Sequence, residues 1–142
     1  MSWIVRTSLL GLCALVGLGV AVERVTIADL LKAPEKYDSK VVTVTGTVNK
    51  FKAKVSKKGN DYFNMRLESS RDEWISVYGQ GKLDKVLHDG DTVEVTGDFA
   101  QTKKVGDVTF KNEVDVTKRS VEEKTKDFGI RIVKSAGQVL GE

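Results

Sequence analysis

The sequence has little of the chemistry on which most enzyme and metal sites depend. Its 142 residues include one cysteine, Cys13, and one histidine, His88. A lone cysteine excludes an internal disulfide, and a lone histidine argues against zinc sites and Ser-His-Asp machinery. There is one proline, Pro34, and no long low-complexity stretch. Disorder is therefore not expected over most of the chain.

The excess of positive over negative charge is also small, since the formal net charge is only +3. So weak an excess does not attract polyanions by itself, and nucleic-acid binding would require locally clustered basic residues. The composition is 40% hydrophobic and 30% charged, which is ordinary for a globular protein. The length favours one domain with one modest hydrophobic core.

The longest uncharged run lies at the N-terminus, where Arg6 precedes residues 7–22. This run is short for a membrane span of about 20 residues and fits the roughly 7–15-residue apolar region of a signal peptide. Gly19 and Ala21 place small residues at the −3 and −1 positions for cleavage after Ala21. We predict that residues 1–21 are a signal peptide or an uncleaved N-terminal membrane anchor. A lipid-modified Cys13 is disfavoured, because Leu12 stands where a small residue is required.

After this leader, the sequence predicts short helices and then strands. Thr26 is a candidate N-cap for a helix with Ile27 and Leu30 at helical spacing. Pro34 suits the first position of a second short turn. From Val41 onward, apolar and polar residues alternate, which is typical of half-buried β-strands. Strands are expected within residues 41–55, 62–68, 74–78, 93–99 and 108–116, separated by turn-forming segments.

Between the third and fourth strands, Leu83, Val86 and Leu87 predict a short amphipathic helix that ends at residues 88–90. The resulting order, β-β-β-α-β-β after a short N-terminal helix, is that of a five-stranded OB-fold barrel. The pattern V-x-V-T-G occurs at residues 42–46 and again at 93–97. We interpret each glycine as the point where a long strand bends sharply in the closed barrel. The predicted fold class is therefore all-β with short helices, with the OB-fold domain in residues 22–118.

The alternation also predicts which side chains form the core. The residues expected to be buried are Val42, Val44, Val48, Phe63, Met65, Leu67, Ile75, Val77, Val93, Val95, Phe99, Val108 and Phe110. Residues 119–142 form a C-terminal extension that is too apolar for pure disorder. Within it, residues 130–133 fit an added strand and residues 135–140 fit a short helix, and both interpretations stay open.

Two segments resemble a known group of proteins. These are A-D-L-L-K-A-P-E-K-Y-D-S-K-V-V-T-V-T-G-T-V, at residues 28–48, and L-H-D-G-D-T-V-E-V-T-G, at residues 87–97. They resemble bacterial exported OB-fold domains of the nucleic-acid-binding, tRNA-anticodon-binding-like kind. The resemblance covers roughly residues 26–118 and implies the fold. It leaves the ligand open, because OB-folds bind oligonucleotides, sugars, metals and proteins.

No set of residues points to catalysis. Asp127-Phe128-Gly129 matches the magnesium-binding tripeptide of kinases, but no other kinase motif is present. The acidic pairs Asp72-Glu73 and Glu122-Glu123 lie in a turn or an exposed run, where solvated surface is the expected role. We predict a non-enzymatic protein with no cofactor and no metal site.

Binding is better supported than catalysis. An OB-fold binds on the face of its second and third strands, between the loops that join strands 1–2 and strands 4–5. Here that face would present Tyr62, Asn64, Arg66, Trp74 and Tyr78. The first loop carries Lys50, Lys52, Lys54, Lys57 and Lys58, and the second carries Lys103 and Lys104. Rings between cationic loops suit single-stranded nucleic acid, because bases stack on the rings and lysines bind phosphates.

Other interpretations of this surface stay open. Lysines at hairpin tips also maintain solubility and protect sheet edges, and exposed aromatic residues also anchor protein partners. Single-stranded nucleic acid or another polyanion is therefore the first predicted ligand. The alternatives are an envelope protein and a small ligand or cation. The leader predicts a periplasmic or secreted protein, which weighs against nucleic acid, and membrane contact is expected only through an uncleaved leader.

Overall fold

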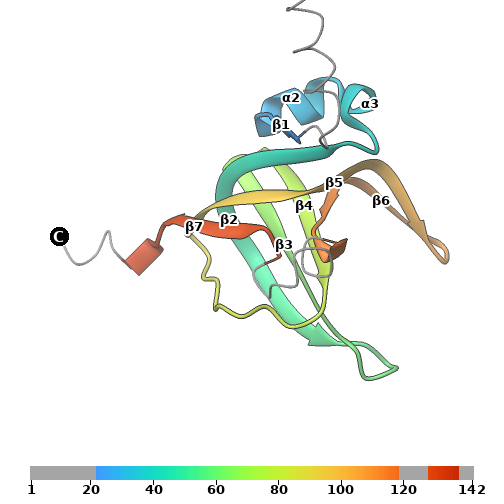
Figure 1. Ribbon diagram of the computed structural model, residues 1–142, viewed down its shortest axis with the longest axis vertical. Coiled ribbons are helices and arrows are strands. Elements are labelled where there is room, and N and C mark those ends of the chain that lie inside the picture. The colour runs from blue at the N-terminus through green and yellow to red at the C-terminus, as the bar shows by residue number, and fades with distance from the viewer. Residues whose placement is uncertain (1–21, 119–127, 138–142) are drawn as a thin grey trace, which may run out of the picture.

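The structure, a computed structural model, describes residues 22–118 and 128–137 (Figure 1). Its elements in chain order are β1 (Val22–Arg24), α2 (Ile27–Lys32), α3 (Pro34–Tyr37), β2 (Val41–Val55), β3 (Asp61–Ser70), β4 (Glu73–Gln80), β5 (Thr92–Val105), β6 (Val108–Asp115) and β7 (Ile130–Lys134). The predicted leader, residues 1–21, lies outside the described residues. Within the described residues, no helix is long and apolar enough to cross a membrane.

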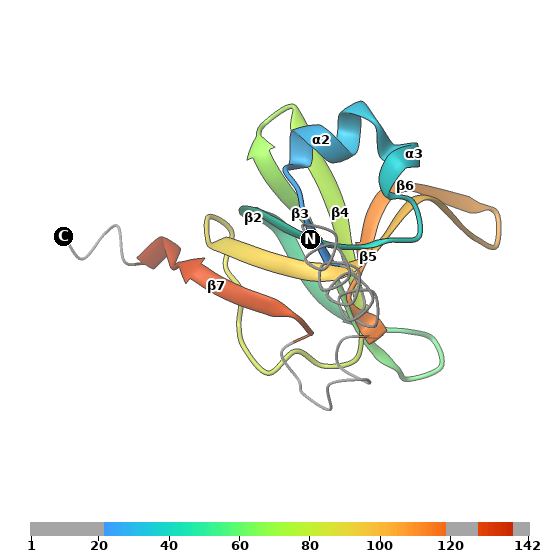
Figure 2. The same cartoon turned by 45° about the horizontal axis from the view of Figure 1, so that its top comes forward.

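Five strands close into a ring in the order β2-β3-β4-β6-β5, and β5 pairs back with β2. All neighbouring pairs in the ring are antiparallel except β4 and β6, which run parallel. The predicted five-stranded barrel is confirmed. Two short strands extend the sheet outside the ring: β1 runs parallel to the start of β2, and β7 lies beside β5 (Figures 1 and 2).

The two longest strands, β2 and β5, each pair with two neighbouring strands and bend where the partner changes. β2 pairs with β5 through residues 41–47 and with β3 from residue 47 onward. β5 pairs with β2 through residues 92–98 and with β6 from residue 98 onward. Gly46 and Gly97, the glycines of the V-x-V-T-G repeats, directly precede these two changes of partner. Each packs so closely that an added Cβ would lie under 3 Å from a neighbouring atom.

The helices predicted after the leader are present and lie over one end of the barrel (Figure 1). Thr26 caps α2 through a reciprocal capping box with Asp29. Pro34 occupies the first turn of α3, as expected. Ile27 and Leu30 are buried in the barrel core. The core of the strands follows the predicted phase, with Phe63, Met65 and Leu67 of β3 inward and their polar neighbours outward.

The short helix predicted over residues 83–87 is absent, because residues 81–91 form an irregular connection. Leu87 is buried in the core there, and Leu83 is partly buried against it. The connection is held by the buried Asp91, whose carboxylate accepts hydrogen bonds from the backbone N–H groups of His88, at 2.9 Å, and Ala136, at 2.8 Å. The first of these hydrogen bonds is local, whereas the second ties the connection to the segment at residues 128–137. A helix of this length has few local hydrogen bonds of its own to oppose such a tie.

The hairpin formed by β5 and β6 differs from the prediction at its tip. β6 pairs with β4 only through residues 113–115, and its earlier residues pair with β5 alone. The hairpin therefore projects from the barrel as an arm (Figures 1 and 2). Val108 and Phe110, which the alternation predicts to be buried, lie on this arm and are 55% and 42% exposed. The other predicted core residues are buried.

The segment after the gap, residues 128–137, packs on the barrel. The predicted strand at residues 130–133 is present as β7. Phe128 and Ile130 are buried in the same core as the strands. The ring of Phe128 meets that of Phe63 edge to face, with 5.2 Å between centroids. Only the first residues of the helix expected at 135–140 lie within the described part of the chain.

Candidate functional site

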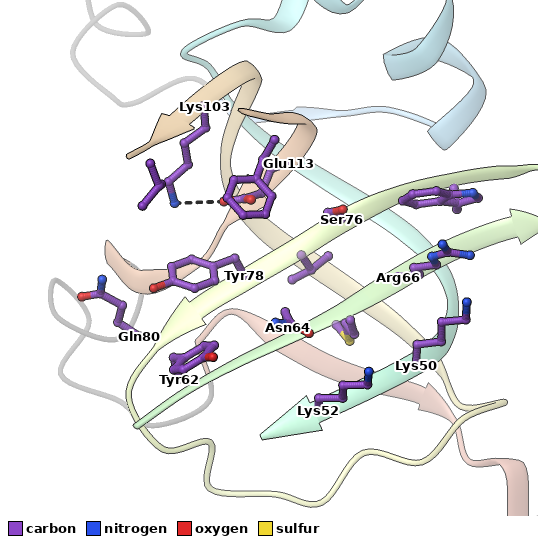
Figure 3. A pocket seen from close by; sticks show the side chains of 15 residues that line it. Lys50, Lys52, Tyr62, Asn64, Arg66, Ser76, Tyr78, Gln80, Lys103 and Glu113 are labelled. Carbon is purple, nitrogen blue, oxygen red and sulfur yellow. Dashed lines mark hydrogen bonds and ion pairs between the residues drawn. The ribbon is translucent and has the colours of Figure 1, made fainter. Parts of the chain in front are cut away.

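A groove of about 600 Å³ crosses the outer face of β3 and β4 (Figure 3). Because side chains alternate along a strand, the residues between the buried core positions point into this groove. β3 supplies Tyr62, Asn64 and Arg66, and β4 supplies Trp74, Ser76 and Tyr78. All six are half-buried. The walls come from β2 on one side and from the β5–β6 arm on the other.

The antiparallel register of β3 and β4 groups the aromatic side chains at the two ends of the groove. Asn64 lies opposite Tyr78, which places the ring of Tyr62 diagonally beside that of Tyr78. Their centroids are 6.2 Å apart and the rings are tilted by 40°. At the other end, the Arg66 guanidinium lies over the Trp74 ring, with Cζ 4.0 Å from the centroid. The groove thus contains a tyrosine pair and a cation-covered tryptophan.

The β2 wall carries free positive charge. Lys50 and Lys52 line the groove from this strand (Figure 3). An irregularity in the register between Asn49 and Lys52, with Lys50 at a positive φ of 55°, interrupts the pairing of β2 with β3 here. Among the described residues, neither lysine has an ion-pair partner, so both charges are available to a ligand.

The opposite wall carries a compensated charge. Lys103 Nζ lies 3.0 Å from Glu113 Oε1, 3.3 Å from Asp115 Oδ2 and 4.3 Å from the centroid of the Tyr78 ring. Burial alone would lower the pKa of Lys103, but the two carboxylates raise it above its ordinary value. Desolvation raises the pKa of Glu113 despite the attraction of Lys103. The charge of Lys103 is thus neutralised by Glu113 and Asp115. The ionised form of Glu113 lowers the stability of the folded protein, because it is poorly solvated there.

The structure brings most of the predicted binding residues to this one groove. Its lining includes Lys52, Tyr62, Asn64, Arg66, Trp74, Tyr78 and Lys103. The other predicted lysines lie elsewhere. Lys57 and Lys58 are exposed in the β2–β3 turn, and Lys104 is exposed on the arm. Lys54 lines a separate hollow of about 320 Å³ beside Lys82 and Lys85.

Sequence reasoning did not identify several residues of the groove. These are Ser76, Gln80, Val105, Phe110 and Glu113, besides the core residues at its floor. Glu113 enters because the parallel pairing of β4 with β6 places it opposite Ser76. Such a pairing joins strands that are distant in the chain, and the alternation within β6 alone does not indicate it. The described residues contain no cluster of side chains that could hold a metal ion.

Comparison with known proteins supports the fold. No protein-family model and no curated protein matches the chain. Among solved structures, a chain from the crystal structure of yeast Stn1 and Ten1 superposes with a TM-score of 0.53 and 18% sequence identity. The match covers 85% of this chain and 68% of that chain. At this identity the similarity shows a shared OB-type fold and does not identify a ligand. The ligand is therefore inferred from the residues of the groove.

Proposed function

We propose that this chain is a non-enzymatic binding module that holds single-stranded nucleic acid in the groove on β3 and β4. The observation that carries the proposal is one groove in which aromatic rings from β3 and β4 lie beside the uncompensated lysines of β2. Bases stack on rings at roughly 1–3 kcal/mol each, and lysines bind the phosphates. The stacking part of this binding tolerates any base, because every base has a flat aromatic face.

The charges give the bound strand an orientation. Within the described residues, Lys50 and Lys52 on the β2 side have no ion-pair partner, whereas Lys103 on the arm is paired with two carboxylates. Phosphates are attracted to the first wall and repelled by Glu113 on the second. We therefore place the sugar-phosphate backbone along β2, with the bases directed across Tyr62 and Tyr78 toward the arm.

The two parts of the site should fail in different ways when they are mutated. The probe is oligo-dT of about 12 nucleotides, which is within the roughly 4–16 nucleotides that one OB fold occupies. The double variant Lys50→Gln/Lys52→Gln should bind it more weakly than wild type. The slope of log K against log[salt] should flatten by about 0.7 for each lost phosphate contact. Tyr78→Ala should weaken binding by roughly 1–3 kcal/mol with little change in slope, since stacking releases few counterions. Fluorescence anisotropy across a salt series measures both.

The matched control is Lys32→Gln/Lys36→Gln, which removes the same charge from α2 and α3, away from the groove. It should leave the slope near the wild-type value. If the groove and control variants bind as tightly as wild type at every salt concentration, the nucleic-acid proposal is wrong.

A protein partner is the second candidate, and the β5–β6 arm is the observation that favours it. Val105, Val108 and Phe110 expose apolar surface at its tip, and Val105 and Phe110 also line the groove. Half-buried Trp74 and Tyr78, beside this exposed apolar surface, are of the residue types that typically anchor protein interfaces. Salt-insensitive binding of an envelope protein, lost in Trp74→Ala and Tyr78→Ala, would favour this candidate over nucleic acid.

Export of the protein is part of the proposal and is supported by Arg6 followed by the uncharged residues 7–22. N-terminal sequencing of the protein recovered from its native cells should find a start near Val22. An intact Met1 in the membrane fraction would establish the anchor instead. Protein found only in the cytosol would contradict both, and would remove the objection that an exported protein meets little nucleic acid.

A further inference from the structure

Glu113 is a buried carboxylate in the wall of a groove that otherwise suits an anion. Its side chain is 5% exposed, yet it lines the groove together with Phe110 and with Tyr78 (Figure 3). Desolvation raises its pKa, so its charge opposes folding more than an exposed carboxylate would. A charged group kept at such a cost in a groove is a candidate for ligand recognition.

The two oxygens of this carboxylate have different surroundings. Oε1 accepts a hydrogen bond from Lys103 Nζ at 3.0 Å. Oε2 has no hydrogen-bond partner within the described residues. Among the described residues, only Asp98 Oδ2 is a side-chain polar atom that is fully buried and has no hydrogen-bond partner. Since Glu113 Oε2 also has no partner among them, it must be accessible from outside. Oε2 is therefore an unused acceptor that a ligand in the groove can reach.

The surroundings hold Glu113 in place. Lys103 contacts Glu113, Asp115 and the Tyr78 ring together, which restrains both the lysine and the carboxylate that it binds. The backbone of Glu113 is fixed between Ala100 of β5 and Ser76 of β4. A rigid acceptor does not need to be ordered when a ligand binds. It therefore discriminates between ligands more strongly than a mobile acceptor does.

We propose that Glu113 makes the groove selective for bases that carry an exocyclic amine over thymine and uracil. This inference rests on the proposed function. Carboxylates accept hydrogen bonds from the N4 amine of cytosine, and the amines of adenine and guanine offer the same donor. Thymine and uracil present a carbonyl oxygen at the position of the cytosine amine. That oxygen would face Oε2 without a proton between them, leaving the buried acceptor unpaired.

The test compares oligo-dC with oligo-dT of equal length on the wild-type protein and on Glu113→Gln. Homopolymers place the same base at Glu113 in every register. Wild type should bind oligo-dC about fivefold or more tightly than oligo-dT, the lower end of what a base contact contributes. Glu113→Gln removes a negative charge and should bind both more tightly. The dC/dT ratio should fall toward one, because the amide offers a donor to the thymine carbonyl as well as an acceptor to the cytosine amine.

Asp115→Asn is the matched control, because Asp115 also pairs with Lys103 but does not line the groove. It removes the same charge and should keep the wild-type ratio. A wild-type ratio near one, or an equal loss of the ratio in both variants, would overturn the role of Glu113 while leaving nucleic-acid binding intact. Failure of the wild-type protein to bind either oligonucleotide would instead overturn the proposed function, and this inference with it.

Discussion

Phe63→Ala should destabilise the protein by about 3–5 kcal/mol, the usual cost of deleting a fully buried phenylalanine side chain. Phe63 is 1% exposed. Its ring meets Phe128 edge to face and lies 6.0 Å from Phe51. The ring also fills the space beside Gly79, where an added Cβ would lie 2.5 Å from it. Truncation therefore leaves a cavity between β3, β4 and the segment at residue 128, and urea unfolding measures the loss.

Phe110→Ala is the matched control, because it removes the same side chain from an exposed position on the β5–β6 arm. Its effect on the free energy of unfolding should stay within about 0.5 kcal/mol, as for most surface substitutions. The comparison also tests the correction made by the structure, since the strand pattern predicts both residues to be buried. Comparable costs for the two variants would place Phe110 in the core and contradict the projecting arm.

The parts of the fold that were predictable depend on local signals. Thr26 marks a helix start through its side-chain hydroxyl and Pro34 through its fixed φ, and both are found in those roles. The inward phase of Phe63 and Ile75 follows from a period of two that a one-residue slip would reverse. Since that phase also sets the outward residues, most of the groove floor could be predicted from the alternation alone.

The parts that were missed depend on distant contacts. Residues 83–87 have the apolar spacing of a helix, but the Asp91 carboxylate binds backbone groups at residues 88 and 136 and holds the segment in another shape. Phe110 has the alternation of a core residue, yet alternation does not tell whether a strand extends beyond its neighbours. Glu113 joins the groove only through the pairing of β6 with β4. Each case requires knowing which distant residues meet.

The composition of the groove depends on the position of β6, and β6 can pack closely against β5 because residue 97 is a glycine. β6 carries Glu113 and pairs with β5, which carries Lys103, so both sides of the ion pair follow the β5–β6 register. Gly97 lies directly before the point at which β5 changes partner from β2 to β6. An added Cβ there would lie 2.7 Å from the carbonyl oxygen of Asp115 and 2.8 Å from Val114 Cγ1. The oxygen belongs to the backbone and can move only if β6 moves.

Gly97→Ala should therefore destabilise the protein by about 1–3 kcal/mol, the typical cost of forcing extra volume into a packed site. Gly46→Ala should have a cost in the same range, because its added Cβ would lie 2.8 Å from Leu67 Cγ, 2.9 Å from Ile27 Cδ1 and 3.0 Å from the backbone oxygen of Glu68. Gly137→Ala is the control, since the nearest atom of the described residues to its added Cβ would be Ser135 Oγ, 3.8 Å away. Urea unfolding of the three variants measures the order of the costs.

The same substitution should also affect the site. If β6 shifts to accommodate the added methyl group of Gly97→Ala, the contact of Lys103 with Glu113 loosens, and oligonucleotide binding should change together with stability. Among the described residues, the atoms nearest the added Cβ of Gly46→Ala belong to Leu67, Ile27 and Glu68, and not to β6. This variant should therefore change stability without changing the salt dependence of binding. Equal stability of Gly97→Ala and Gly137→Ala would contradict the close approach of β5 and β6. It would also remove the reason for a glycine at the end of the second V-x-V-T-G repeat.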